Sequence, residues 1–388
     1  MTMQIRHAQI LSGGLAHGTA DVAVRDDRIA RVGDGGTDTG PVVDATGLVC
    51  GPGLVDVHVH GAQGHDTLDA SSQAFAAIGR HLARHGVTSW APTTVSHDAA
   101  TLAAVVDAHR DHRRGHDEAR SVGLHLEGPY LSPARCGAQD PAHLRDADPT
   151  EWRRWLDSGE VALITLAPER DPGLALTAAA TRAGVRVSIG HSDGDAARTT
   201  AAVDVGATQA THLFNGMPPL HHREPGVVGA CLTDPRVFVQ VIPDLVHLHP
   251  TVLRLVAQAA GPDRVVLVSD AIRATGLDDG SYRLGDQQVT VRDGVARTAQ
   301  GGLAGSTLEL LDGVANWREA TGVDLATAWH AASGVPARAL GLDDRGVVRP
   351  GATADLVLLD PTTLRPLLTV VAGVVAHDAL PDERWIRR

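Results

Sequence analysis

Over the first fifty residues, short apolar β-branched runs alternate with turn residues, and no helical period separates them. Ala23-Val24-Arg25, Arg28-Ile29-Ala30 and Val42-Val43 are examples of these runs. Alternation of this kind, punctuated by turn residues, is typical of half-buried β-strands. We therefore predict a small sheet over residues 1–50.

From Leu54 onward the pattern changes to longer apolar runs, which are separated by segments rich in Ala, Leu and Arg with helical spacing. This is the alternation of strand and helix that builds a parallel sheet. The runs lie at 54–58, 87–92, 121–126, 161–167, 185–190, 208–213, 237–242 and 264–269. Eight such units are the strand count of a (β/α)8 barrel of the TIM type.

The C-terminal region of the chain alternates between sheet-like and helical patterns. Residues 283–299 alternate like a β excursion, helical texture returns around 306–320 and 325–333, and residues 354–376 are again β-like. The most economical arrangement has both chain ends building one small sheet domain beside a central barrel. We therefore predict an N-terminal segment of the sheet domain at 1–50, the barrel at 51–345, and a C-terminal segment of the sheet domain at 346–388.

Composition narrows the class of protein and its partners. The 388 residues include 43% hydrophobic and 21% charged residues, which is ordinary for a globular protein. A net charge of −12 at pH 7 repels nucleic acid and acidic membrane surfaces, so an anionic ligand needs a local cationic pocket. The N-terminus resembles no signal peptide and no apolar stretch reaches ~18 residues, so we expect a cytoplasmic protein without a membrane segment.

The chain contains no lysine, and this excludes several chemistries. A Schiff-base lysine, a phosphate-loop lysine and a carbamylated-lysine metal bridge are all impossible. The cysteines are Cys50, Cys136 and Cys231, an odd number without a CxxC pair. This argues against a disulfide framework and a thiolate zinc site, and favours a reducing compartment.

Ionisable residues fall at the ends of five of the predicted strands, where the loops of a barrel converge over one mouth. They are His58, His60, Glu127, His191, His212 and Asp270. In an extended strand the side chains of His58 and His60 lie on the same face, within reach of one ion. An isolated HxH pair is weak evidence, because His247 and His249 repeat it. The pair His58 and His60 is accompanied by two further imidazoles and two carboxylates at other strand ends. Together these six side chains predict a divalent metal site, with zinc or iron as the candidate ions. The other histidines, such as His109, His112 and His116, we interpret as surface residues.

Several motifs stand together in an order that resembles a known family. Residues 51–61, GPGLVDVHVHG, resemble the opening signature of the amidohydrolase superfamily. Within it, the chain resembles the family of N-acetylglucosamine-6-phosphate deacetylases over essentially its whole length. The motifs are HLEGPY at 125–130, GHS at 190–192, THLFNGM at 211–217, REPG at 223–226, SDA at 269–271 and LAGS at 303–306.

This resemblance implies a metal-dependent barrel hydrolase with a small β-sandwich built from both termini, commonly a homodimer. The implied reaction converts N-acetylglucosamine 6-phosphate into glucosamine 6-phosphate and acetate. Glu127, His191 and His212 would be the main metal ligands, and Asp270 would be the catalytic acid/base and a further ligand. His58 and His60 would complete a second metal position, so one or two ions per subunit are expected. The residues implied to bind substrate are Ala138, Gln139, Asn215, Gly216, Arg223, His247 and Leu303.

The implied substrate site has a phosphate end and an acetyl end. Arg223 and His247 match positions that hold the substrate phosphate, and Arg223 is expected to reach across a dimer interface. Gln139 stands where the family typically carries a histidine that contacts the acetyl carbonyl. Glutamine can donate a hydrogen bond there but cannot become cationic. Cys136 lies in the same loop, and we assign it no role.

The sequence leaves other functions open. The same reaction on N-acetylgalactosamine 6-phosphate differs by one hydroxyl configuration, which the sequence does not resolve. A cyclic-amide hydrolase commonly needs a carbamylated lysine, and a deaminase has no evident need for Arg223 and His247. A catalytically inactive sugar-phosphate binder is the alternative from another class, although retention of all six metal and acid residues argues against it.

Overall fold

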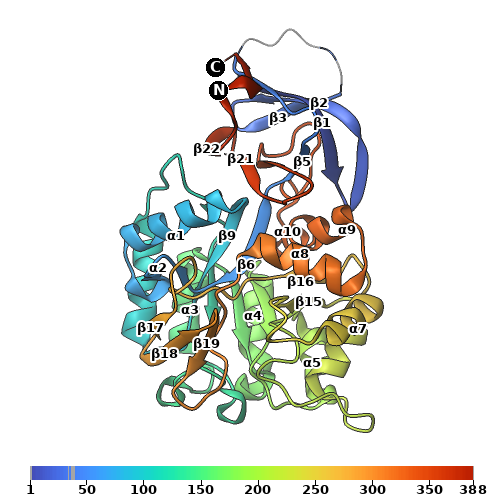
Figure 1. The fold of residues 1–388 in the computed structure, drawn as a ribbon. Helices are drawn as coiled ribbons and strands as arrows, with labels where there is room; N and C mark the ends of the chain where they lie inside the picture. Colours follow the sequence, from blue (N-terminus) through green and yellow to red (C-terminus); the bar gives the residue numbers. More distant parts are fainter. Residues whose placement is uncertain (1, 34, 36–39, 388) are drawn as a thin grey trace.

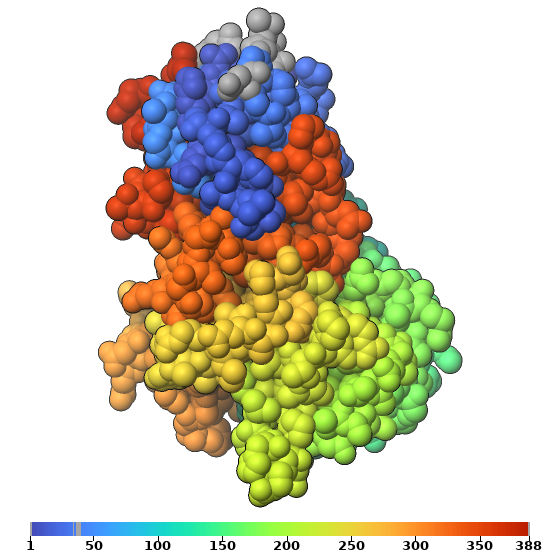
Figure 2. Space-filling model, turned by 90° about the vertical axis from the view of Figure 1, so that its right-hand side faces the viewer, coloured from blue at the N-terminus to red at the C-terminus, as the bar shows by residue number. Residues whose placement is uncertain are grey.

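The computed structural model describes residues 2–33, 35 and 40–387. Figure 1 shows a sheet domain at the top, which carries both chain ends, above a larger layered body of strands and helices. Figure 2, turned by 90°, shows the same stacking, with the N-terminal and C-terminal segments side by side above the middle of the chain. The predicted pairing of the two chain ends in one small domain is confirmed.

The larger body is a nearly closed parallel barrel of eight strands, as predicted. In spatial order the strands are β6 (Leu54–Val59), β9 (Val87–Thr94), β11 (Leu124–Glu127), β12 (Val161–Leu166), β13 (Arg186–Ile189), β14 (Gln209–Ala210), β15 (Phe238–Val241) and β16 (Val265–Leu267). The short β10 (Arg120–Ser121) also pairs with β9. A parallel bridge between Val59 and Ala271 joins the first strand to the segment after the last one. The strand ends of β6 and β16 are therefore adjacent, although about two hundred residues separate them in the chain.

Helices follow most of the barrel strands and cover them from outside. They are α1 (Ser72–Arg84), α2 (Ala99–Asp111), α3 (Pro149–Ser158), α4 (Ala175–Arg182), α5 (Ala196–Val205), α6 (Gly226–Thr233), α7 (Pro250–Ala260), α8 (Leu310–Thr321), α9 (Leu325–Ala331) and α10 (Gly334–Leu340). Helix α1 shows why such segments are helical: Ser71 caps its first turn, and Phe75, Ile78 and Leu82 form one buried stripe.

Over the described residues, the small domain is a mixed sheet of nine strands. They are β1 (Thr2–Ser12), β2 (Leu15–Arg25), β3 (Arg28–Val32), β4 (Val42–Asp44), β5 (Val49–Pro52), β20 (Leu356–Leu359), β21 (Pro366–Val371), β22 (Val374–Asp378) and β23 (Trp385–Arg387). The first half of β1 pairs with β4 and its second half with β5, so the sheet forks there. The branches share an apolar core that includes Ile5, Val22, Leu356 and Val370.

The predicted β excursion is a three-stranded antiparallel sheet, β17 (Gly280–Leu284), β18 (Gln287–Arg292) and β19 (Val295–Thr298). It follows the last barrel strand and lies at the lower left of Figure 1. No helix among the described residues is long and apolar enough to cross a membrane. The division of the chain at residues 50 and 345 stays a prediction, although β5 runs to Pro52 and β20 begins at Leu356.

Candidate metal centre and active-site cavity

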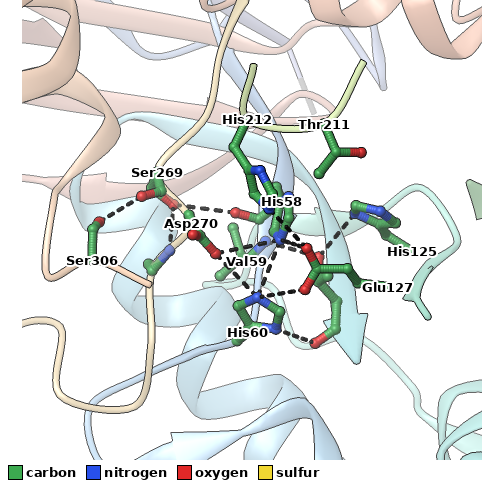
Figure 3. A network of polar contacts seen from close by, with 12 residues as sticks. His58, Val59, His60, His125, Glu127, Thr211, His212, Ser269, Asp270 and Ser306 are labelled. Atoms are coloured by element: carbon green, nitrogen blue, oxygen red, sulfur yellow. Dashed lines mark hydrogen bonds and ion pairs between the residues drawn. The ribbon is translucent and has the colours of Figure 1, made fainter. Parts of the chain in front are cut away.

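The six side chains predicted from strand ends converge on one buried centre. His58 lies near the end of β6 and His60 just after it, and Glu127 is the last residue of β11. His191, His212 and Asp270 follow β13, β14 and β16. Figure 3 shows His58, His60, Glu127, His212 and Asp270 pointing toward one another. All six are buried.

The polar atoms form two adjoining groups of three, each with its ligand atoms within 4.8 Å of one another: His58, His60 and Asp270, and Glu127, His191 and His212. In the first group, Asp270 Oδ1 lies 3.3 Å from His58 Nε2 and 3.1 Å from His60 Nε2. In the second group, Glu127 Oε1 lies 3.2 Å from His191 Nε2 and 3.0 Å from His212 Nε2. In each group, one carboxylate oxygen thus lies within 3.3 Å of two imidazole nitrogens.

Three of these residues adopt a backbone conformation that non-glycine residues rarely take. The φ angles are +47° at His191, +28° at His212 and +51° at Asp270. Such left-handed conformations cost roughly 1–3 kcal/mol each and concentrate at functional sites. Gly216 permits the close packing, because a Cβ atom there would lie 2.7 Å from Nδ1 of His191. The chain is therefore bent to aim these side chains inward.

The donor set fits a divalent cation. His60 Nδ1 lies 3.2 Å from the carbonyl oxygen of Thr93, and His191 Nδ1 lies 2.7 Å from that of Arg135. A carbonyl only accepts, so Nδ1 of both rings donates, and Nε2 is the nitrogen that faces the centre and can ligate an ion. His58 Nε2 also faces His60 Nε2 at 3.1 Å. Imidazole nitrogens and carboxylate oxygens are electron-rich and repel one another at these distances when buried. A cation between them removes this repulsion.

The electrostatics of the centre lead to the same conclusion. Burial lowers the pKa of His60, but the carboxylates of Asp270 and Glu127 outweigh it and raise the pKa to about 9. Burial raises the pKa of Asp270, but His58 and His60 outweigh it and lower the pKa to about 2. The two carboxylates thus remain ionised and attract positive charge to the imidazoles.

A second buried network lies beneath the centre, and sequence reasoning did not predict it. His125 Nε2 lies 2.7 Å from Thr165 Oγ1, which lies 2.6 Å from Thr211 Oγ1. Burial and the neighbouring His58 lower the pKa of His125 well below its usual value, so the ring is neutral. Its ring contacts that of His58 edge-on at 4.7 Å. The alternation that singled out His58 and His60 could have found it, because His125 and Glu127 are also two residues apart on a strand.

A cavity of about 270 Å³ opens above the centre. Its lining contains five of the six predicted metal and acid residues, with His58 buried beneath. Six of the seven residues implied to bind substrate also line it, namely Ala138, Gln139, Asn215, Gly216, His247 and Leu303. Val95 and Leu284 of the wall were not predicted, because their apolar side chains carry no chemical signal in the sequence.

An amidohydrolase family model matches residues 50–378, which include the whole barrel and every residue of the centre. The chain belongs to the amidohydrolase family. Two curated relatives match most of the chain as well. It is 42% identical to an N-acetylgalactosamine-6-phosphate deacetylase of Escherichia coli O157:H7, over 81% of this chain and 84% of that protein. It is 40% identical to an N-acetylglucosamine-6-phosphate deacetylase of Vibrio furnissii, over 86% of this chain and 84% of that protein.

Solved structures give the same result for the fold. An N-acetylglucosamine-6-phosphate deacetylase variant from Mycobacterium smegmatis, in complex with N-acetyl-D-glucosamine-6-phosphate, superimposes with a TM-score of 0.86. It is 37% identical to this amidohydrolase, and the match covers 97% of this chain and 99% of that one. The barrel with a sheet domain built from both termini is thus the fold of an enzyme solved with that substrate.

Gln139 has a contact in this amidohydrolase that the sequence did not predict. Its Nε2 donates to Glu127 Oε2 at 2.6 Å, and its Oε1 accepts from the backbone N–H of Ser96 at 2.6 Å. An amide nitrogen carries two protons, so one remains for a group in the cavity. Gln139 therefore holds Glu127 in place, and its predicted contact with an acetyl carbonyl stays a prediction.

Arg223 does not reach the cavity of its own chain. It lies in the exposed segment 219–225, and its Nη1 contacts His222 Nε2 at 2.7 Å. It lines a separate surface pocket instead, together with Asp193 and Glu224. In Figure 2 the yellow-green lobe, whose colour corresponds to residues near 220, projects below the barrel. The structure thus places Arg223 apart from the other predicted site residues.

Proposed function

We propose that this amidohydrolase hydrolyses the acetamido group of N-acetylglucosamine 6-phosphate, giving glucosamine 6-phosphate and acetate. The observation that carries the proposal is the pair of His₂-carboxylate groups beneath a cavity lined by the predicted substrate residues. We assign zinc or iron to these groups, with one ion position in each. A divalent ion supplies such a site with a water whose pKa is lowered from about 15.7 to about 7.

Asp270 is the residue that we assign to proton transfer. Its Oδ1 faces the imidazoles of His58 and His60, so Oδ2 is the oxygen left to take the proton of the attacking water. Its lowered pKa keeps the carboxyl ionised at neutral pH, which is the state that a proton acceptor starts from. The protonated carboxyl then returns the proton to the departing sugar amine. A positioned acid/base of this kind contributes about 10²–10⁴-fold.

The test is acetate release by Asp270→Asn, measured with chelator-treated protein before and after zinc or iron is added back. We expect turnover to fall at least about 10²-fold. The matched control is Asp278→Asn, the same chemical change at an exposed residue on the following loop, which should leave turnover unchanged. Near-wild-type turnover by Asp270→Asn would show that the base is misassigned.

We also propose a homodimer, and the need to bind the substrate phosphate supports it. Among the described residues that line the cavity there is no arginine, although a phosphate dianion suits a bidentate guanidinium. His247 lines the cavity, and its Nδ1 lies 2.7 Å from Asp244 Oδ2, so Nε2 is left for the ligand. We propose that Arg223, on its exposed segment, enters the neighbouring subunit's cavity. Arg223→Ala should then raise KM with little change in kcat, and cross-linking or light scattering should show a dimer.

The galactosamine epimer is the second candidate substrate, because a curated relative that is 42% identical carries that activity in its name. Both epimers present the same acetamido group and phosphate, and they differ in one hydroxyl. Side-by-side measurement of kcat/KM decides between them. A ratio above about tenfold, or 1.4 kcal/mol of differential transition-state binding, would identify the preferred substrate.

A further inference from the structure

A third group of imidazoles and a carboxylate lies outside the active centre and joins three loops. His97 follows β9, His143 ends the short 3-10 helix η3 (Pro141–His143), and Asp286 forms the turn between β17 and β18. Their possible ligand atoms all lie within 4.8 Å of one another. Ser96 and Gln139 of the active site are near His97 and His143 in the chain, and Leu284 of the cavity wall is near Asp286.

The geometry of this group repeats that of the active centre. Asp286 Oδ2 lies 3.2 Å from His97 Nε2 and 3.3 Å from His143 Nε2, so one carboxylate oxygen is again shared by two Nε2 atoms. The corresponding pairs at Asp270 and Glu127 measure 3.0–3.3 Å. An ion with tetrahedral bonds of about 2.0–2.1 Å sets neighbouring ligand atoms about 3.3 Å apart. The observed spacing is that of ligands around a metal ion.

The two histidines are held in place by a scaffold of their own. Arg145 Nη1 donates to the carbonyl oxygens of His97 at 3.0 Å and His143 at 2.7 Å. Glu151 binds the same guanidinium at 2.6 and 3.0 Å, and Tyr130 donates to Glu151 at 2.8 Å. The imidazole rings stack with centroids 4.3 Å apart and planes inclined by 21°. This stacking holds the rings side by side, with both Nε2 atoms within 3.3 Å of Asp286 Oδ2.

Neighbouring groups bind the atoms of His97 and Asp286 that face away from the proposed ion position. His97 Nδ1 lies 2.8 Å from Asp98 Oδ2 and 2.9 Å from the backbone nitrogen of Asp98. The carboxylate can accept a proton from Nδ1, and in that tautomer the Nε2 lone pair faces Asp286. A carboxylate that orients a ligating histidine in this way is a common outer partner of protein metal sites. Arg283 contacts Asp286 through Oδ1, at 3.3 Å, and not through the Oδ2 atom that faces the imidazoles.

We propose that His97, His143 and Asp286 bind a divalent transition-metal ion of the zinc class, with water completing the coordination. Two imidazoles and one carboxylate are a ligand set that suits zinc. The ion would fasten the β17–β18 turn to the loops after β9 and before α3. Since Leu284 and Gln139 border the substrate cavity, this site would stiffen two of the segments that form its wall.

A superficially similar group serves as an internal comparison. In the cluster of His81, His85 and Glu309, His81 Nε2 contacts Glu309 Oε1 at 2.7 Å, the distance of a charge-assisted hydrogen bond. His85 contacts the other carboxylate oxygen, at 3.5 Å. Gln63 Nε2 also lies 3.2 Å from His81 Nδ1, which as acceptor leaves the proton on Nε2. This cluster is a hydrogen-bonded pair with a neighbour, and it should hold no ion.

The test counts zinc in full-length, chelator-treated protein after dialysis against buffered zinc at a concentration that saturates the active centre. We expect His143→Ala to bind one zinc fewer per chain than the wild type. Asp286→Asn should lose the same equivalent, and its half-exposed side chain can be changed without burying an unpaired group. The matched control is His85→Ala, which should bind as much zinc as the wild type.

A second measurement separates metal binding from a folding defect. Zinc should slow amide hydrogen exchange over residues 280–292 in the wild type and in His85→Ala, but not in His143→Ala. Cobalt(II) in the same three proteins should show visible absorption that falls in His143→Ala alone. Equal zinc counts in the wild type, His143→Ala and Asp286→Asn, or the loss of an equivalent in His85→Ala alone, would overturn the proposal.

Discussion

Replacing Gln139 with alanine tests whether the buried amide holds the metal centre together. The Gln139 side chain joins the backbone N–H of Ser96 to Glu127 Oε2 through two contacts of 2.6 Å each. The other oxygen of Glu127 faces His191 and His212. Gln139→Ala frees Glu127 to rotate and leaves two buried polar groups with one partner fewer. The carboxylate then no longer stands pre-oriented for an ion.

The magnitude follows from the type of hydrogen bond that is lost. A hydrogen bond to a charged group contributes about 1.5–3 kcal/mol, and about 1.4 kcal/mol corresponds to a tenfold change in an equilibrium constant. Gln139→Ala should therefore weaken metal binding by about 10- to 100-fold. This agrees with the usual effect of removing an outer partner of a metal ligand, also about 10–100-fold.

The assay is competition for zinc between the protein and a chromophoric chelator, with kcat/KM measured separately at saturating zinc. Ser96→Ala is the matched control, because Gln139 is anchored by the backbone N–H of Ser96 and not by its hydroxyl. A zinc Kd for Gln139→Ala within about threefold of the wild type would refute the reasoning, since Glu127 would then be oriented without its amide partner. Lost kcat/KM that saturating zinc does not restore would support the predicted contact with the acetyl carbonyl.

Three further predictions concern the fold and its metal. Trp329→Phe should lower the free energy of unfolding by about 1–3 kcal/mol in urea titrations followed by circular dichroism, because Trp329 donates to the buried Pro52 carbonyl at 2.8 Å; a smaller loss would mean that another donor replaces it. Burial and the charge of Arg338 lower the pKa of His330, so the folded state binds fewer protons than the unfolded state and loses stability as pH falls through about 6.5. His330→Asn should therefore show a smaller fall in Tm between about pH 7.5 and 5.5 than the wild type, and an equal fall would contradict this. Chelation should lower the Tm of the wild type, since an ion held at about 100 times its Kd stabilises the folded state by about 2.7 kcal/mol; an unchanged Tm would be incompatible with a metal centre.

Much of the barrel could be predicted from the sequence, because a buried parallel strand appears as a short continuous run of apolar residues. Each of the eight predicted runs overlaps an observed barrel strand, and the register of side chains along β6 places His58 and His60 together. Strand β14 is only Gln209–Ala210, much shorter than its predicted run. The residues after it leave the extended conformation, and His212 at φ +28° is aimed by that bend. Strand length at the rim depends on the neighbouring loops, which the local pattern does not describe.

The alternation of apolar and polar residues, the strand-end positions of six ionisable side chains and the absence of lysine determined the fold class and the kind of chemistry. These are local properties, set by side-chain period and by the common direction of parallel strands. Only the tertiary structure decided which atoms meet: Gln139 with Glu127, Arg223 away from its own cavity, and Asp286 between His97 and His143. Those contacts join segments far apart in the chain, and their geometry follows from how loops pack on the finished barrel.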